Sequence, residues 1–274
     1  MRRALAAVLC AAPLAAAPAR AAFTSGDVGT TAAEFLRLGA GARALGLGEA
    51  YTAAADDATA LYWNPAGLAR VRGGEAALMH AAYLDSTFYD DAFYAQNLGA
   101  WGAAGAGVQY FSAGSIPGTD ASGVSIGSFA PSDLSASLGW AWRLRSSSPW
   151  LDGAALGAAG KYVRATIATT AQTEAADFGA QSPAWLGGRL RLGLAALNVG
   201  RDMKFDAEAE PLPTVIKLGA ALRPAPNWLA AVDADAPRGG APYAACGVEY
   251  RLPLSGGDAA SGRLGYNTRA ASAL

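Results

Sequence analysis

Apolar and polar side chains alternate along much of the chain. In residues 189–199, for example, Leu192 and Leu194 fall on one side of an extended backbone, while Arg191 and Gly193 fall on the other. This alternation has the period of a β-strand, whose successive side chains point to opposite faces. With the turn signals between segments, it predicts about eleven strands, over residues 75–83, 92–98, 102–112, 135–144, 154–165, 174–181, 189–199, 214–223, 227–235, 243–252 and 262–268.

The two faces of the clearest strands differ in kind. Every charged residue lies on one face, and the other face is apolar, often with Trp or Tyr near an end. Strands of about nine to eleven residues can cross a bilayer at a tilt, and aromatic ends suit the membrane interface. The pattern predicts an all-β fold, an antiparallel transmembrane β-barrel. The alternative is a soluble β-sandwich, although its polar face would carry more Lys and Glu than the Gly, Ala and Ser found here.

Two connections are longer than the others. Residues 113–131 and 198–212 lack the alternation and are rich in turn-forming residues. We expect both to be loops, at the end of the barrel opposite the short turns.

The composition favours a membrane protein. Hydrophobic residues make up 52% of the 274 residues, charged residues only 16%, and the mean hydropathy is +0.18. An ordinary soluble domain has about 25% charged residues, and a disordered chain would be less apolar. The pI of about 5.9 and the lack of a basic patch exclude nucleic acid as a partner. The lipid of the outer membrane is the expected surrounding.

The first residues are typical of an export signal. Arg2 and Arg3 precede an apolar stretch over residues 4–17, and Ala19-Arg20-Ala21 has the form of a cleavage site. Residues 1–21 are therefore predicted to be a signal peptide that directs export of the chain, and an exported transmembrane β-barrel is expected in the bacterial outer membrane. An uncleaved N-terminal anchor helix is the alternative.

Residues 22–74 differ from the rest of the chain. They are rich in glycine and do not alternate. Residues 58–63 favour a helix that Asp56 or Asp57 would cap, and Asn64-Pro65 should end it, because the residue before a proline avoids the helical conformation. We predict a compact hatch, or plug, over residues 22–74 and a barrel wall over residues 75–274.

The hatch region also carries a resemblance to a known family. Residues 33–50 and 55–68 resemble the start of the PorV/PorQ family of outer-membrane proteins. Weaker landmarks follow in the family's order: Thr119-Asp120, Gly160-Lys161-Tyr162, Leu197-Asn198-Val199-Gly200, Pro211-Leu212-Pro213, Gly247-Val248-Glu249-Tyr250 and Arg263-Leu264-Gly265-Tyr266. The resemblance implies a FadL-like barrel of about 14 strands with an N-terminal hatch. Its hatch motif would lie at Asn64, Pro65, Ala66 and Gly67.

The resemblance implies two functions. The first expectation is transport of hydrophobic compounds across the outer membrane through a hatch-gated barrel. The alternative is a component of type IX secretion that binds or shuttles exported cargo proteins at the outer membrane. The expected partner is accordingly a hydrophobic small molecule or a secreted cargo protein.

One feature departs from the family pattern. Family members continue for several more strands and end on an aromatic strand, whereas here the last residues are Ser272-Ala273-Leu274. We expect a wall that lacks closing strands, so that the first and last strands are unpaired.

The charges of the hatch are the candidate site residues. A charge inside a barrel is costly unless it is paired, so we predict that Arg43 pairs with Asp56, Asp57 or a wall carboxylate and fixes the hatch. The alternative is a solvated charge in a periplasmic vestibule. With the hatch motif, the predicted structural or gating residues are Arg43, Asp56, Asp57, Asn64, Pro65, Ala66 and Gly67.

Signals for catalysis and cofactors are weak. Gly39, Gly41 and Ala44 fit a dinucleotide-binding spacing, but no βαβ unit follows them. His80 is the single histidine, and no nucleophile motif accompanies it. The sequence therefore predicts no enzyme, no cofactor and no metal site.

Overall fold

A computed structural model of the chain describes residues 31–83, 85–167, 169–206 and 208–271. The predicted signal peptide and residues 22–30 of the predicted hatch lie outside the described residues. Among the described residues, no helix combines the length and the apolar character needed to cross a membrane.

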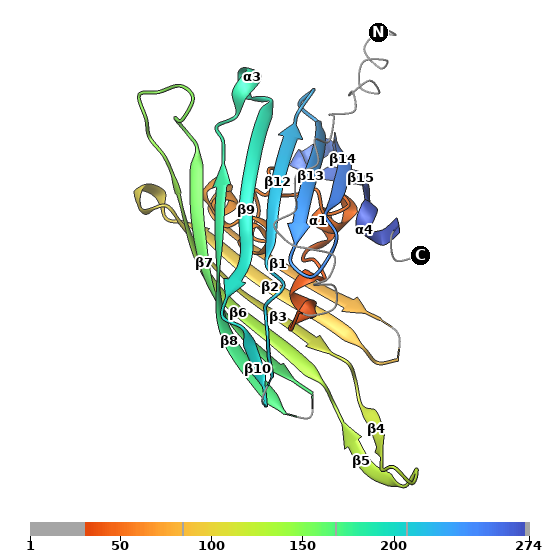
Figure 1. The fold of residues 1–274 in the computed structure, drawn as a ribbon. Helices are drawn as coiled ribbons and strands as arrows, with labels where there is room; N and C mark the ends of the chain where they lie inside the picture. The colour runs from red at the N-terminus through yellow and green to blue at the C-terminus, as the bar shows by residue number, and fades with distance from the viewer. Residues whose placement is uncertain (1–30, 84, 168, 207, 272–274) are drawn as a thin grey trace.

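The wall is one antiparallel sheet of eleven strands that curves around the N-terminal segment (Figure 1). Its strands follow the chain in the order β1-β2-β3-β6-β7-β8-β9-β12-β13-β14-β15. Each strand expected from the alternation is present. The bounds are β1 Gly74–Ala82, β2 Phe88–Asn97, β3 Ala103–Ser112, β6 Ser132–Arg143, β7 Ala155–Thr166, β8 Thr170–Gln181, β9 Leu190–Gly200, β12 Val215–Leu222, β13 Trp228–Pro237, β14 Tyr243–Pro253 and β15 Ala259–Asn267.

The sheet does not close into a barrel. Strands β1 and β15 are its two edges, and among the described residues they do not pair with each other. The unpaired first and last strands agree with the expectation from the sequence. The shape is an open trough whose concave side holds the N-terminal segment (Figure 1).

The two long connections are not simple loops, which corrects the prediction from the sequence. Residues 113–131 form a hairpin of β4 (Ile116–Thr119) and β5 (Ser125–Phe129), and β10 (Met203–Phe205) pairs with β11 (Glu208–Glu210). These strands are too short to give a clear period. Both hairpins project from one end of the sheet, which we call the hairpin end (Figure 1).

The opposite end of the sheet collects the tryptophans, and we call it the tryptophan end. Of the seven tryptophans, only Trp63 belongs to the N-terminal segment. The others lie near strand ends or in the connections at this end: Trp101, Trp140, Trp142, Trp150, Trp185 and Trp228. The tryptophans expected near strand ends are therefore concentrated at one end, whereas other aromatic residues, such as Phe88 and Tyr110, lie near the hairpin end.

The N-terminal segment, residues 31–71, is called the hatch below. It contains η2 (Glu34–Arg37), α1 (Ala42–Gly46), α2 (Ala60–Trp63) and η3 (Pro65–Arg70). The remaining short helices lie outside it: η4 Gly99–Trp101, α3 Trp185–Gly188, η5 Ser255–Gly257 and α4 Thr268–Ala271. Most hatch side chains are buried against the concave side of the sheet.

The expected capping of the hatch helix was wrong. Helix α2 begins at Ala60, its N-cap is Thr59, and no side chain caps it. Asp57 instead accepts hydrogen bonds from the backbone N and the Oγ1 of Thr59, at 3.0 and 2.6 Å, in the turn before the helix. The expected end of the helix is confirmed, because Asn64 has an extended backbone with φ of −165°.

Glycines on the inward face let the hatch approach the wall closely. At eight of them, a methyl group in place of the hydrogen would come within 3.0 Å of a hatch atom. In four places two such glycines face each other on neighbouring strands. The positions are Gly105 and Gly139, Gly157 and Gly179, Gly193 and Gly219, and Gly247 and Gly265. We call these eight positions the glycine belt, and they mark the level at which the hatch packs against the concave side of the wall.

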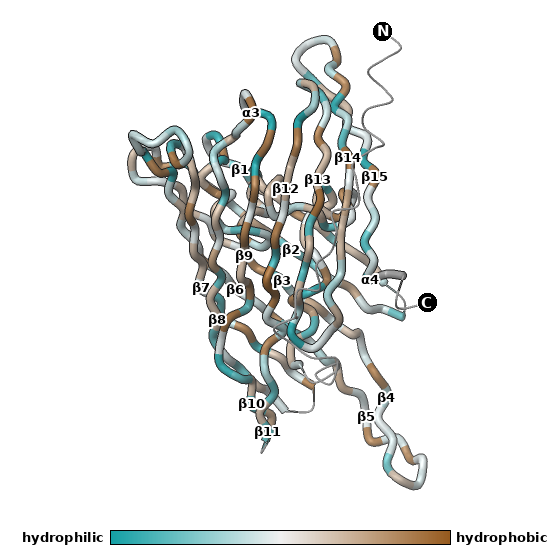
Figure 2. The backbone as a smooth tube through the Cα atoms, turned by 45° about the horizontal axis from the view of Figure 1, so that its top comes forward, coloured by the Kyte–Doolittle hydropathy of each residue, from teal (hydrophilic) through white to brown (hydrophobic). Residues whose placement is uncertain are grey.

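The outer face of the sheet is apolar and exposed. Leu78, Leu138 and Leu264 have exposed fractions of 82, 72 and 77%. Apolar residues recur along the strands between more polar ends (Figure 2). A soluble chain rarely leaves so much apolar surface in contact with water.

The glycine belt leads to a test within one strand. Gly157→Ala in β7 would place a methyl group 2.4 Å from the backbone of Pro65 and Ala66, whereas Gly160 of the same strand has nothing within 4 Å of that position. We expect Gly157→Ala to lower the free energy of unfolding by about 1–3 kcal/mol, the usual cost of overpacking. Gly160→Ala should change it by less than about 0.5 kcal/mol. Denaturant titrations of both variants in detergent micelles would measure this, and equal effects would contradict the belt.

Candidate functional site

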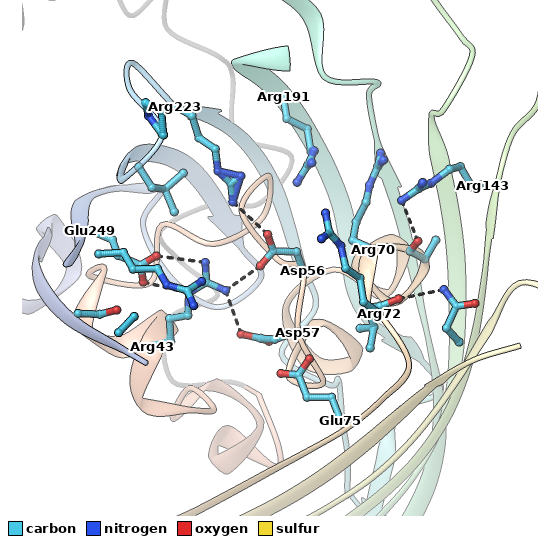
Figure 3. A pocket seen from close by; sticks show the side chains of 18 of the residues that line it. Arg43, Asp56, Asp57, Arg70, Arg72, Glu75, Arg143, Arg191, Arg223 and Glu249 are labelled. Atoms are coloured by element: carbon cyan, nitrogen blue, oxygen red, sulfur yellow. Dashed lines mark hydrogen bonds and ion pairs between the residues drawn. The ribbon is translucent and has the colours of Figure 1, made fainter. Parts of the chain in front are cut away.

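An ion-pair network joins the hatch to the wall around Arg43. Its Nη1 lies 2.7 Å from Oδ1 of Asp56 and 3.3 Å from Oδ2 of Asp57. Its Nε lies 3.0 Å from Oε2 of Glu249 on β14 (Figure 3). The pairing expected of Arg43 is therefore present, with both hatch aspartates and with a wall carboxylate. Its Nη1 also donates to the hydroxyl of Tyr51 at 2.7 Å.

Two wall arginines extend the network. Arg223, after β12, lies 3.1 Å from Asp56, and Arg263 of β15 lies 2.6 Å from Glu249. Burial disfavours the charged form of Arg43, but its neighbours, among them Tyr51, Asp56 and Glu249, outweigh that effect and raise its pKa above the usual value. The guanidinium therefore stays charged at every pH the protein meets.

The sequence did not identify these wall partners. Glu249 lies on the charged face of its strand, which left it as one candidate among several wall carboxylates. Arg223 and Arg263 were not singled out, because their proximity depends on how strands far apart in the chain are placed around the hatch.

The hatch motif binds the wall through backbone groups. The side-chain amide of Asn64 donates to the carbonyl of Thr52 at 2.8 Å and to the wall carbonyls of Ala180 and Leu194, at 3.2 and 3.4 Å. Its Oδ1 accepts from the backbone N of Ala66 at 3.1 Å. Asn64 thus uses both ends of its amide, one to shape its own turn and the other to join the hatch to β8 and β9.

The rest of the motif fills the space beside Asn64. Pro65, Ala66 and Gly67 are buried in η3. A methyl group on Gly67 would lie 2.5 Å from the carbonyl oxygen of Ala55, so this position accepts no larger residue without movement. The motif is a tightly packed turn whose backbone lies directly on β7 and β8.

A second set of charges lies on the hairpin side of the hatch, and sequence reasoning missed it. Lys161 of β7 is 2.7 Å from Oδ2 of Asp177 on β8, and Lys217 of β12 pairs with Asp235 of β13. All four side chains are buried. The available signal was the placement of each lysine on the charged face of its strand.

The hatch aromatics cover these lysines. The ammonium of Lys161 lies 5.8 Å from the ring centre of Tyr62, and that of Lys217 lies 5.4 Å from the ring centre of Trp63. A cation over an aromatic face is attracted to it, most strongly where water is excluded. Ion pairs from the wall and rings from the hatch therefore fill the concave side at this level.

A third wall contact fixes the hatch backbone. Oδ2 of Asp233 on β13 accepts from the backbone N of Tyr51 and of Thr52 at 3.0 and 2.9 Å, and from Thr52 Oγ1 at 2.6 Å. This carboxylate holds the loop between α1 and α2 against β12 and β13.

The hatch separates two cavities of very different size. The larger, of about 1680 Å³, lies at the tryptophan end, and its charged lining is largely arginine (Figure 3). The smaller, of about 30 Å³, lies on the hairpin side beside Lys161 and Lys217. Between them the hatch is packed against the wall, with most of its core side chains inaccessible to water.

The described residues offer little for catalysis. They contain no group of three or more His, Cys, Asp or Glu side chains placed to hold a metal ion. His80 lies on the outer face of the edge strand β1, with Nδ1 2.5 Å from Oδ1 of Asp90.

The fold and site define a class of protein, an apolar-faced antiparallel sheet that encloses its own N-terminal hatch. Residues 22–224 match the family model described as type IX secretion system protein PorV. Because this match covers well over half of the 274 residues, the chain belongs to the PorV family of type IX secretion proteins. A comparison with curated proteins found no match. The family resemblance expected from the sequence is confirmed, and the family is a secretion component rather than a known family of enzymes.

The network around Arg43 can be tested by removing its charge. Arg43→Gln leaves Asp56 and Asp57 facing Glu249 with less compensation, so we expect a loss of about 2–3 kcal/mol in the free energy of unfolding. Hydrogen exchange should accelerate mainly in the hatch. The control is Arg201→Gln, because Arg201 is exposed at the hairpin end. A uniform increase in exchange across hatch and wall would contradict a local role in fixing the hatch.

Proposed function

We propose that this protein is an outer-membrane component of the type IX secretion system that binds exported cargo proteins. The observation that carries the proposal is the family match over residues 22–224. In this proposal residues 1–21 are a leader that is removed, residues 22–74 are the N-terminal domain that contains the hatch, and residues 75–274 are the wall domain, whose first strand β1 extends back to Gly74.

The outer face supports placement in a membrane. Exposed leucines along the strands would be stable against lipid and unstable against water. The tryptophans at one end suit the headgroup region, where indole rings are enriched. Outer-membrane barrels place longer loops outside the cell and short turns in the periplasm. We therefore place the hairpin end outside the cell and the tryptophan end in the periplasm.

The packing around the hatch favours a role in cargo binding over transport of small molecules. Transport of a hydrophobic compound needs an apolar path past the hatch. In the described part of the chain, the larger cavity is lined with charges and the smaller one is only about 30 Å³. The residues Arg43, Asp56, Asp57, Asn64, Pro65, Ala66 and Gly67 would then act as structural anchors that keep the hatch shut.

The β4–β5 hairpin is the proposed cargo contact. It forms a two-stranded sheet separate from the wall and projects beyond the wall strands (Figure 1). Val124 and Ile126 of this hairpin have exposed fractions of 60 and 70%. Apolar side chains on a projecting hairpin are suited to contact another protein, because their burial on binding is favourable.

The membrane placement is tested by a charge on the outer face. Leu218 of β12 points outward, so Leu218→Arg should lower the free energy of unfolding in lipid vesicles by about 2–4 kcal/mol, the cost of arginine near the bilayer centre. Ser128→Arg in the projecting hairpin should change it by less than about 0.5 kcal/mol. A small cost at both positions would indicate that the outer face meets water.

The cargo contact is tested by making the hairpin polar. Val124→Ser combined with Ile126→Ser should reduce several-fold the exported protein that co-purifies with the tagged chain from native outer membranes. The matched control is Leu151→Ser, an exposed leucine at the tryptophan end, which should leave capture unchanged. Uptake of a hydrophobic dye into vesicles that contain the protein is measured in parallel. Dye uptake above that of empty vesicles, with no cargo captured, would favour transport and overturn the proposal.

A further inference from the structure

The arginine-rich cavity at the tryptophan end has an uneven charge. Nine arginines and five carboxylates line it. Three of those carboxylates, Asp56, Asp57 and Glu249, are already paired with arginines on the side of the cavity nearest β14 and β15. The remaining positive charge is therefore concentrated on the other side.

That side carries Arg70 of the hatch, Arg143 of β6 and Arg191 of β9 (Figure 3). Among the described residues, none of the three forms an ion pair. Arg70 donates to the carbonyl of Ser182 at 3.0 Å and to Oε1 of Gln181 at 3.4 Å, and Arg143 donates to the carbonyl of Ala69 at 3.2 Å. Each guanidinium has five N–H donors, so these neutral acceptors leave most donors free for a ligand.

Two further observations indicate that the cluster lacks a partner. The Nε of Arg191 is buried and has no hydrogen-bond partner among the described residues. Burial and the nearby charges of Arg191 and Arg143 lower the pKa of Arg70 to about 10. A buried donor without an acceptor and mutual repulsion between arginines are both costly, and an oxyanion among them would relieve both.

We propose that this cavity is a binding site for a multivalent oxyanion, a phosphate or carboxylate ligand, held by Arg70, Arg143 and Arg191. Guanidinium groups match such anions because they donate two parallel hydrogen bonds at once. The volume of about 1680 Å³ exceeds that of an ordinary small-molecule pocket, about 300–1,000 Å³. The site therefore has room for a hydrated anion or for the phosphate of a larger molecule. This proposal does not depend on the cargo role.

The test measures binding to the full chain in detergent micelles by isothermal titration. The probes are inorganic pyrophosphate, citrate and the short-chain lipid dihexanoyl phosphatidic acid. We expect binding of at least one probe that weakens as salt is raised, because screening reduces attraction between charges. Binding of pyrophosphate or citrate indicates a free anion as the source, and binding of the lipid alone indicates a headgroup.

Variants separate ligand binding from a structural role. Arg191→Gln and Arg70→Gln should each weaken binding of the active probe about tenfold or more, whereas Arg164→Gln, an exposed arginine on β7, should not. Without ligand, Arg191→Gln should keep or raise the thermal midpoint of unfolding, because it removes repulsion between arginines. If Arg191 had a structural role instead, its replacement would lower the midpoint. At the same concentration, the ligand should raise the midpoint of the unaltered chain more than that of Arg191→Gln. Absence of binding by all three probes, or binding by Arg70→Gln and Arg191→Gln as tight as that of the unaltered chain, would overturn the proposal.

Discussion

The close approach of the hatch backbone to the wall is the constraint on which the structure depends. A methyl group on Gly265 would lie 2.0 Å from the backbone N of Gly48, and one on Gly179 would lie 2.0 Å from Oδ1 of Asn64. No side chain fits in such a space, so the inward face must be glycine where the hatch crosses it and small elsewhere. The 34 glycines and the low charge of the chain follow from this requirement as well as from the apolar outer face.

Charges are placed on either side of this contact level and are joined in pairs. Arg43 links Asp56 and Glu249 on the tryptophan side, and the lysine–aspartate pairs lie on the hairpin side. A buried ion pair adds little net stability, because the loss of hydration offsets the attraction, but breaking one is costly. The Arg43 pairs join the hatch to the wall, so loss of one partner would leave a partly buried charge at this contact. The lysine–aspartate pairs join neighbouring wall strands, and the hatch meets them through the rings of Tyr62 and Trp63.

The period of the strands was readable from the sequence because the two faces of the wall meet opposite environments. Leu192 and Leu194 are exposed, while Gly193 and Ala195 at the alternate positions are buried, as the alternation indicates. The predicted starts of four strands were too late. Strands β6, β8 and β15 begin at Ser132, Thr170 and Ala259, before the expected residues 135, 174 and 262. In the fourth strand, β2, both faces carry charge. Strand β2 was expected to start at residue 92, but it starts at Phe88, because Asp90 and Asp91 point to opposite faces and interrupt the pattern.

The site was predictable only in its local part. The pairing of Arg43 with Asp56 and Asp57 followed from the cost of an unpaired charge among residues close in sequence. Wall partners of Arg43 such as Glu249 depend on where strands distant in sequence lie around the hatch. The alternation of apolar and polar residues carries no information about that placement. The surplus of arginines at the tryptophan end was hidden for the same reason, since Arg70, Arg143 and Arg191 are far apart in the chain.

The position of the hatch in the chain also sets an order of assembly. Residues 31–71 precede β1, and their atoms lie against the inward glycines of eight wall strands from β3 to β15. During synthesis and export from the N-terminus, the hatch therefore emerges before any strand that will enclose it. One short segment therefore contacts strands near both edges of the open sheet, from β3 to β15. It connects wall strands that share no hydrogen bonds with one another, so the curvature of the sheet and the position of the hatch depend on each other.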